Sequence, residues 1–382
     1  MVTPRLGLGF EYRSNAFRAD TDPQGTGNFQ VAPGVDVVAE TPSIMFGLNG
    51  TYVLNKFVFL TNPDGALSSD EISRQITRLD RFNTFNVGVN FHALRDRQVS
   101  FKLQNTTLLQ NNPNDSVPDA DDPYATQFRN SLSGTVPIRP GPALTVEPGA
   151  MWNYADFFVP SALDQRESFN RRQTYGPTLN AAYNFLPRTA FVFQGSFLWN
   201  NWNDNNPTVG SLTFPTPNSR MMRLQVGVQG RITERLRAVA RVGYGYAWFD
   251  SDGNLPAADG LLVDLQGDYS VTEQHRVALG YRKGFIDSFF TNAAGINTVY
   301  ARWNGAYGKR VTSSLQYGLR FENYTGAIER NDIVNQLNLQ VNVNATDWAQ
   351  INLNGGWLGR LSSADEVEYN DVRALLGATF QY

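Results

Sequence analysis

Apolar and polar residues alternate with a period of two along almost the whole chain, and helical periodicity is nearly absent. One run is representative: it sets Ala238, Ala240, Val242, Tyr244, Tyr246 and Trp248 against Arg237, Arg241, Gly243 and Gly245. Successive side chains of a β-strand point to opposite faces, so this pattern is typical of strands with one apolar face. The sequence therefore predicts an all-β protein.

The connections between these runs are of two kinds. Short turns recur roughly every 36 to 54 residues, which leaves room for two strands and one longer loop. They lie at 41–43, 95–97, 139–141, 186–188, 233–235, 272–274, 308–310 and 346–348. The loops between them are longer and rich in Asn, Asp, Pro and Gly, as at 111–122, 200–218 and 250–260.

This asymmetry predicts a transmembrane antiparallel up-and-down barrel of about 18 strands, with 16 as the alternative, formed by residues 1–382 as a single domain. The short turns would be periplasmic and the long loops extracellular. A soluble propeller or two-sheet repeat is the competing fold class. The turn asymmetry and the C-terminal strand, which ends in Phe380-Gln381-Tyr382, favour the bacterial outer membrane.

Composition is compatible with such a barrel. Mean hydropathy is −0.35, and no apolar run approaches the roughly 18 residues that a membrane helix needs. A barrel strand averages to a polar value because lipid-facing and lumen-facing residues alternate. The 25 Phe, 16 Tyr and 7 Trp residues are expected in interfacial girdles, as Trp199, Trp248, Phe285, Trp357 and Tyr382.

Sites for chemistry are scarce. The chain has no cysteine and two histidines, His92 and His275, which are far apart in the sequence. The acidic loops at 115–122 and 250–254 lack the closing glutamate of a calcium loop. No nucleophile–base arrangement or phosphate-binding glycine loop is present. We therefore expect no enzymatic activity, no metal, no cofactor and no nucleic-acid partner.

Once the apolar faces are assigned to lipid, the opposite faces of the strands between positions 223 and 322 would face the lumen. These faces are rich in arginine. The predicted pore-lining residues are Arg223, Arg231, Arg237, Arg241, Arg276, Arg282, Arg302, Arg320, Asp264, Asp268 and Glu322. The net charge of the chain is −3, so positive charge is concentrated on one wall. Guanidinium groups suit carboxylate, sulfate or phosphate. The wall would guide anions through the lumen, or its arginines would brace the barrel through carboxylate pairs.

The long extracellular loop at 61–80 contains the one helical signal. Ser68 and Glu71 have the spacing of a capping box, and apolar residues follow at helical intervals. The spacing predicts a short helix over 67–79. If the helix folds inward, its charged residues would form a constriction: Asp70, Glu71, Arg74 and Arg78. The alternative is an external flap.

Three N-terminal segments carry a family resemblance: Gly9 to Phe17, Phe29 to Val35, and Phe46 to Tyr52. They resemble the first strands of the beta-barrel porin 2 family, whose members often accompany exopolysaccharide loci. The resemblance covers mainly the first 55 residues, and it implies passage of a polysaccharide through the outer membrane. The start of the chain lacks signal-peptide features, which predicts a mature or truncated N-terminus.

The function expected from these observations is a monomeric outer-membrane channel for secretion of an anionic exopolysaccharide. Its partners would be the polymer or an anionic solute, outer-membrane lipid and lipopolysaccharide, and an export component in the periplasm or inner membrane. Two alternatives remain: a passive porin for small anions or sugars, and a closed barrel that serves as a surface adhesin or structural anchor.

Overall fold

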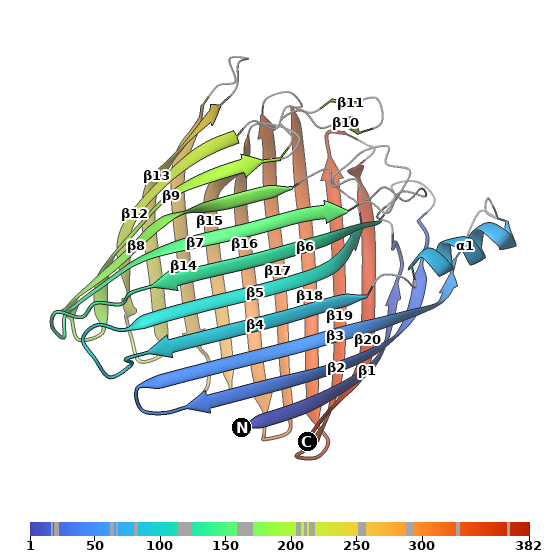
Figure 1. The fold of residues 1–382 in the computed structure, drawn as a ribbon, viewed down its shortest axis with the longest axis horizontal. Coiled ribbons are helices and arrows are strands. Elements are labelled where there is room, and N and C mark those ends of the chain that lie inside the picture. Colours follow the sequence, from blue (N-terminus) through green and yellow to red (C-terminus); the bar gives the residue numbers. More distant parts are fainter. Residues whose placement is uncertain are drawn as a thin grey trace.

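The computed structural model is a closed antiparallel barrel of 18 strands (Figure 1). The structure describes residues 1–16, 18, 23–61, 65, 68–79, 83–113, 124–158, 171–203, 208–209, 212–213, 218–250, 257–287, 293–325, 329–364 and 367–382. The predicted fold class and strand number are confirmed, and the alternative of 16 strands is wrong.

One wall of the barrel consists of the first nine strands. They are β1 (Val2–Arg13), β2 (Thr26–Glu40), β3 (Ile44–Leu60), β4 (Thr84–Ala93), β5 (Phe101–Pro113), β6 (Tyr124–Thr135), β7 (Leu144–Phe158), β8 (Arg172–Leu186) and β9 (Thr189–Trp202). The single described helix, α1 (Ser69–Leu79), lies between β3 and β4 in the sequence. A separate two-stranded sheet pairs β10 (Thr208–Val209) with β11 (Leu212–Thr213).

The opposite wall consists of the last nine strands (Figure 1). They are β12 (Asn218–Arg231), β13 (Leu236–Asp250), β14 (Ala258–Ser270), β15 (His275–Asp287), β16 (Ala293–Tyr307), β17 (Val311–Thr325), β18 (Arg330–Asn344), β19 (Ala349–Ser362) and β20 (Tyr369–Gln381). β9 pairs with β12, and β1 pairs with β20, which closes the barrel. Both termini lie at the end that carries the short turns (Figure 1), and all eight predicted turns connect neighbouring strands there.

Contacts between non-neighbouring strands identify the concave face. Arg223 on β12 donates to the carbonyl oxygen of Phe285 on β15, and the Tyr300 hydroxyl on β16 donates to Gln266 on β14. A side chain that reaches past one or two intervening strands can do so only on the inner side of a curved sheet. Residues of the opposite parity therefore point outward, and many are exposed large apolar residues, such as Val226, Val242 and Leu279.

The exposed outward face indicates where the protein resides. Soluble monomers rarely expose contiguous apolar patches of this extent, whereas an outer-membrane barrel requires an apolar band that faces lipid. The closed barrel with an apolar exterior places this chain in the bacterial outer membrane. Among the described residues, no helix is long and apolar enough to cross a membrane.

Phe285 does not lie on the lipid-facing side, so its assignment to an interfacial girdle is wrong. Its ring is buried with Met221, Ala247 and Leu262, which come from three other strands and face the lumen. Gly284, the preceding residue, also faces Leu262. The strict alternation of β15 therefore breaks between Gly284 and Phe285, which places an apolar cluster on the inner wall.

Candidate functional site

The eleven residues predicted to line the pore share the concave face of strands β12 to β17. The register shows this directly: Arg241 pairs with Asp264, Asp264 with Arg282, and Arg282 with Thr298, which in turn pairs with Arg320. Directly opposed residues of an antiparallel pair lie on the same side of the sheet. Sequence parity thus brings these side chains to one wall, where they separate into paired and unpaired groups.

Asp264 is the centre of the first paired group. It accepts a hydrogen bond from Nη2 of Arg241, and Nε of Arg282 lies 3.3 Å from its second oxygen. The Arg282 guanidinium also lies 5.5 Å from the ring centroid of Tyr300. The Arg282 side chain nevertheless stays 61% exposed, compared with 19% for Arg241. Arg241 is therefore a bracing residue, whereas Arg282 braces the wall and also presents charge to the lumen.

Two further arginines are held by backbone carbonyls. Nη2 of Arg223 lies 2.5 Å from the carbonyl oxygen of Phe285, and its guanidinium lies 5.7 Å from the ring of that residue. Arg231 donates through Nε to the carbonyl oxygen of Glu234 at 3.1 Å. Both side chains stabilise local geometry, the first above the apolar cluster and the second in the short turn.

The unpaired group consists of Arg237, Arg276 and Arg302. All three residues are exposed, and within the described part of the chain none forms an ion pair. Arg237 and Asp268 are register partners, but Asp268 instead accepts from the side-chain amide of Gln266 at 2.8 Å. These three guanidinium groups are therefore the cations of this wall that have no ion-pair partner among the described residues, and they are available to a solute.

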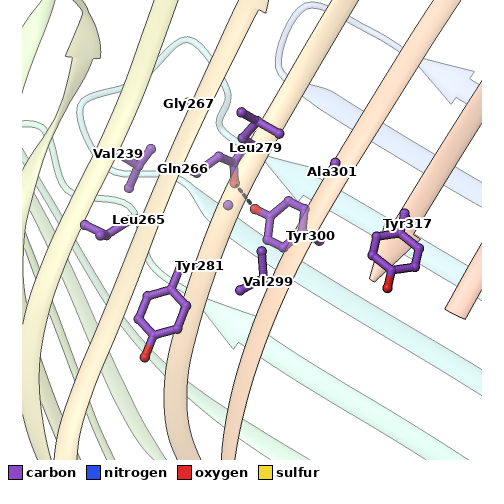
Figure 2. A pocket seen from close by; sticks show the side chains of 11 residues that line it. Val239, Leu265, Gln266, Gly267, Leu279, Tyr281, Val299, Tyr300, Ala301 and Tyr317 are labelled. Carbon is purple, nitrogen blue, oxygen red and sulfur yellow. Dashed lines mark hydrogen bonds between the residues drawn. The ribbon is translucent and has the colours of Figure 1, made fainter. Parts of the chain in front are cut away.

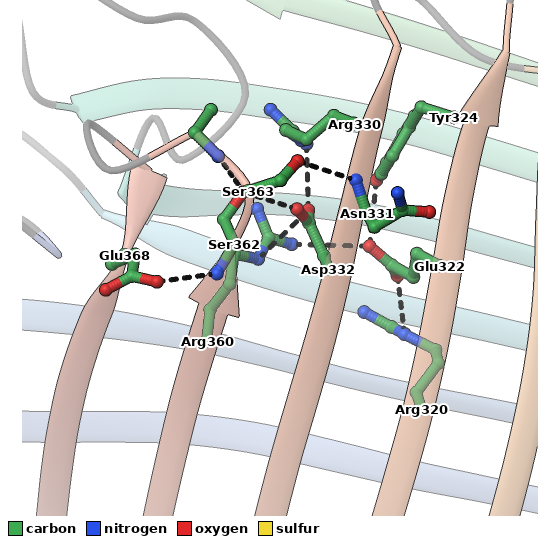
Figure 3. Close-up of polar contacts among 11 residues, drawn as sticks. Arg320, Glu322, Tyr324, Arg330, Asn331, Asp332, Arg360, Ser362, Ser363 and Glu368 are labelled. Carbon is green, nitrogen blue, oxygen red and sulfur yellow. Dashed lines mark hydrogen bonds and ion pairs between the residues drawn. The ribbon is translucent and has the colours of Figure 1, made fainter.

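Arg320 and Glu322 belong to a second paired group, on β17 to β19 (Figure 3). Nε of Arg320 lies 2.6 Å from Glu322, and Nη2 of Arg330 lies 3.0 Å from Asp332. Arg360 lies 3.8 Å from each of these carboxylates. Arg330, Asp332, Arg360 and Glu322 are all buried. We call Arg320, Glu322, Arg330, Asp332 and Arg360 the buried ionic cluster.

Hydroxyl groups complete the hydrogen bonding of this cluster. The Tyr324 hydroxyl donates to Glu322 at 2.8 Å, and the Ser362 hydroxyl donates to Asp332 at 2.6 Å. The Arg330 guanidinium lies 4.4 Å from the Tyr324 ring. With two carboxylates shared among three guanidinium groups and two hydroxyls, the cluster fixes three strands to one another rather than presenting charge to a solute.

Sequence reasoning missed Arg330, Asp332 and Arg360 as members of this site. Their signal was the same alternation that identified Arg320, because Arg320 pairs with Val334 and Val334 with Arg360 in the register. The cluster also has a neighbour across the barrel seam: Nη2 of Arg13 lies 2.6 Å from buried Asp371. Extending the parity assignment past Glu322 would have identified Arg330, Asp332, Arg360 and Asp371.

The proposed constriction does not form from Asp70, Glu71 and Arg74. Helix α1 extends away from the barrel beyond the end of β3 (Figure 1), and these three residues are exposed. Leu79, at the other end of the helix, packs with Ile76 on buried Phe57 of β3. That contact fixes the C-terminal end of α1 at the rim and directs its charged N-terminal turn outward. The side chain of Arg78 lies outside the described residues.

The remaining lumen wall is mostly neutral. On β5 to β8, inward positions carry mainly hydroxyls and amides, and the ion pair between Lys102 and Glu147, 3.3 Å apart, balances its own charge. Two arginines, Arg129 and Arg172, share this face, because each pairs with Ala155 in the register. No group of three or more described His, Asp or Glu residues could hold a metal. The acidic loops 115–122 and 251–254 lie outside the described residues. The lumen thus combines a cationic wall with a neutral polar wall.

Comparisons with known proteins support the fold. No protein-family model and no curated protein matches the chain. Among solved structures, OccK9 (OpdG) of Pseudomonas aeruginosa has a TM-score of 0.52 at 12% identity, covering 100% of this chain and 98% of that one. OpdK of the same organism, with vanillate, has a TM-score of 0.51 at 13% identity, covering 100% and 99%.

A third solved structure has a similar score over less of its own length. The FrpB iron transporter of Neisseria meningitidis has a TM-score of 0.51 at 8% identity, covering 100% of this chain and 81% of that one. At these identities the similarity establishes a shared barrel fold. The choice of solute depends on the residues of this chain.

Proposed function

We propose that this chain is a passive outer-membrane channel for small anionic solutes and catalyses no reaction on them. The observation that carries the proposal is the exposed, unpaired set of Arg237, Arg276 and Arg302 on one lumen wall. Cations in a low-dielectric channel raise the local concentration of anions and favour their passage. Arg282 adds charge at the same wall, since most of its side chain is exposed although Asp264 holds one edge.

Small solutes fit better than a secreted polymer. OpdK was solved with vanillate, a small carboxylate, and FrpB is described as an iron transporter. The resemblance to the beta-barrel porin 2 family rests on three N-terminal segments, and no family model matches the chain. The passive-porin alternative is therefore preferred to exopolysaccharide export, and no export component is required.

Ion selectivity in planar bilayers tests this function. The wild-type barrel is expected to prefer chloride to potassium, measured as a reversal potential across a KCl gradient. Arg276→Gln and Arg302→Gln, combined, should lower that preference about threefold, because two of the three free cations are lost. Liposome swelling should show entry of small carboxylates that slows in the same variant.

Arg220→Gln is the matched control. Arg220 lies on the outward face of β12, paired with Trp199 and Trp248 in the register, and it is exposed. The Arg220→Gln substitution removes a positive charge without changing the lumen, so ion selectivity should stay at the wild-type value. Equal loss in the control and the lumen variant would contradict guidance by the wall. Complete absence of conductance would favour a closed barrel that serves as an anchor.

A further inference from the structure

The outward face of β15 carries a lysine in the lipid-facing band. Lys283 is exposed and pairs with Val263 of β14 and Asn297 of β16. Its orientation follows from its neighbours: an ideal Cβ on Gly284 would lie 3.6 Å from inward-facing Leu262, so the preceding side chain points outward. A charge on the lipid-facing side of a barrel is unfavourable in a depth-dependent way. It therefore requires a compensating partner or access to the interface.

No described residue compensates the charge of Lys283. Among the described residues, Lys283 forms neither an ion pair nor a hydrogen bond. Asn297, beside it, accepts a hydrogen bond from the Tyr281 hydroxyl at 3.0 Å through Oδ1, which leaves its amide N–H groups as donors. Lys283 and the amide N–H groups of Asn297 thus present several donors at this point on the outer wall. An anionic group with several acceptor oxygens matches that arrangement.

An apolar groove lies close to these donors on β14 to β16, and Figure 2 shows the side chains that line it. It measures about 410 Å³ and is lined on the outward face mainly by Leu265, Leu279, Tyr281 and Val299, with small residues Gly267 and Ala301 between them. Tyr281 precedes Lys283 by two positions, so the lysine lies about 7 Å farther along the same face. The groove is available because Gly267 adds no side chain: a Cβ there would meet nothing within 4 Å.

We propose that this surface binds lipopolysaccharide, with a lipid A phosphate on Lys283 and Asn297 and an acyl chain in the groove. Lys283 lies toward the end of β15 that carries the long loop, and the groove lies on the periplasmic side of the lysine. An amphiphile bound this way has its anionic head toward the cell exterior, as lipids of the outer leaflet do. Charge complementarity and the order of the two parts along the strand together select this occupant.

Native mass spectrometry of the delipidated barrel tests the proposal. Bis-phosphorylated lipid A is titrated into the protein in detergent, and one molecule is expected to bind per barrel. Lys283→Gln should weaken binding about tenfold, the loss expected for one charge-assisted hydrogen bond. Lys56→Gln is the matched control, because Lys56 pairs with Phe29 on the outward face of distant β3 and its loss should leave the affinity unchanged.

The groove is tested separately by filling it. Gly267→Leu should reduce lipid A binding by a similar factor while the barrel folds normally, because the site is open. Gly318→Leu is the control: Gly318 is equally open but faces the lumen. Unchanged binding in Lys283→Gln would show that the lysine only reaches toward the interface and would overturn the proposal. Equal affinity for phosphatidylglycerol or for dephosphorylated lipid A would overturn the assignment to lipopolysaccharide.

Discussion

At the scale of single residues, the lumen separates arginines that hold the barrel together from arginines that face the solute. The separation depends on whether a carboxylate lies within reach. Asp264 holds Arg241 and one edge of Arg282, whereas Asp268 accepts from Gln266 and forms no ion pair with Arg237. Bracing and anion guidance, which the sequence left as alternatives, therefore apply to different members of the same wall.

Asp332→Ala should destabilise the barrel strongly. Asp332 is 1% exposed and is the partner of Arg330, Arg360 and the Ser362 hydroxyl. Its removal leaves the buried Arg330 guanidinium without its counter-charge and leaves Arg360 with Glu322 alone, which costs about 3 to 5 kcal/mol. The free energy of unfolding in phospholipid vesicles, measured by guanidinium titration, checks this.

Asp250→Ala is the comparison for that variant. Asp250 and Arg220 form an ion pair at 3.4 Å with both side chains about half exposed. An exposed pair is screened by solvent and contributes less than about 1 kcal/mol. If both aspartate variants lose the same stability, the buried ionic cluster is not what fixes β17 to β19.

Glu71 makes the start of α1 sensitive to acid. The Ser68 backbone N–H donates to Glu71 at 2.8 Å, and the Ser68 hydroxyl donates at 2.7 Å. These hydrogen bonds, with a smaller contribution from Arg74, hold the pKa of Glu71 below its ordinary value of 4.5. Because the pKa is lowered in the folded state, the stabilisation is complete above pH 4.5 and is lost as pH falls through the lowered value.

Amide exchange checks this prediction. Protection of the Ser68 amide, corrected for intrinsic rates, should decrease on acidification in the wild type. In Glu71→Gln the protection should be lower at neutral pH and nearly independent of pH over the same interval. A wild-type amide that stays protected after Glu71 protonates would show that the capping box does not hold the first turn.

At the scale of elements, alternation and turn spacing predicted the strands, whereas tertiary contacts decided the exceptions. The capping box predicted α1, but its direction depends on Leu79 packing against Phe57, 22 positions earlier in the sequence. Phe285 was assigned to the outward face because strict alternation along β15 was assumed. That alternation breaks between Gly284 and Phe285, so the Phe285 ring faces the lumen. The burial of Asp332 likewise depends on what covers it in three dimensions, which no local pattern records.

Gly243→Ala should impair assembly of the barrel. Gly243 pairs with Gln225 across β12 and β13, and a Cβ at this position would lie 1.9 Å from the carbonyl oxygen of Leu224. A backbone atom cannot move aside as a side chain can, so the two strands must separate locally, at a cost of about 2 to 4 kcal/mol. The folded fraction, measured by heat-modifiable gel mobility, should decrease.

Gly267→Ala provides the matched control one strand away. An added Cβ there meets nothing within 4 Å, so the folded fraction should equal that of the wild type. If the two alanine variants fold equally well, close approach of β12 and β13 at Gly243 is not required for closure.

At the scale of the whole molecule, charge is distributed unevenly around the lumen. Three exposed arginines without an ion pair, Arg237, Arg276 and Arg302, lie on β13, β15 and β16. The described inward positions of β5 to β8 are mainly neutral and add Arg129 and Arg172. A solute therefore experiences a transverse field across the lumen. Such a field acts at a distance, so its effect on permeation must depend on the Debye length of the electrolyte.

Anion selectivity should therefore fall with ionic strength. The Debye length is about 10 Å at 0.1 M salt and about 3 Å at 1 M, so an exposed guanidinium acts across much of the lumen in the first case and only near the wall in the second. The chloride-to-potassium permeability ratio should approach unity at 1 M KCl while remaining above it at 0.1 M. Arg276→Gln combined with Arg302→Gln should flatten this dependence. A ratio that stays constant between the two concentrations would mean that anions are chosen by a specific contact site, and the free arginines would not be guiding them through their field.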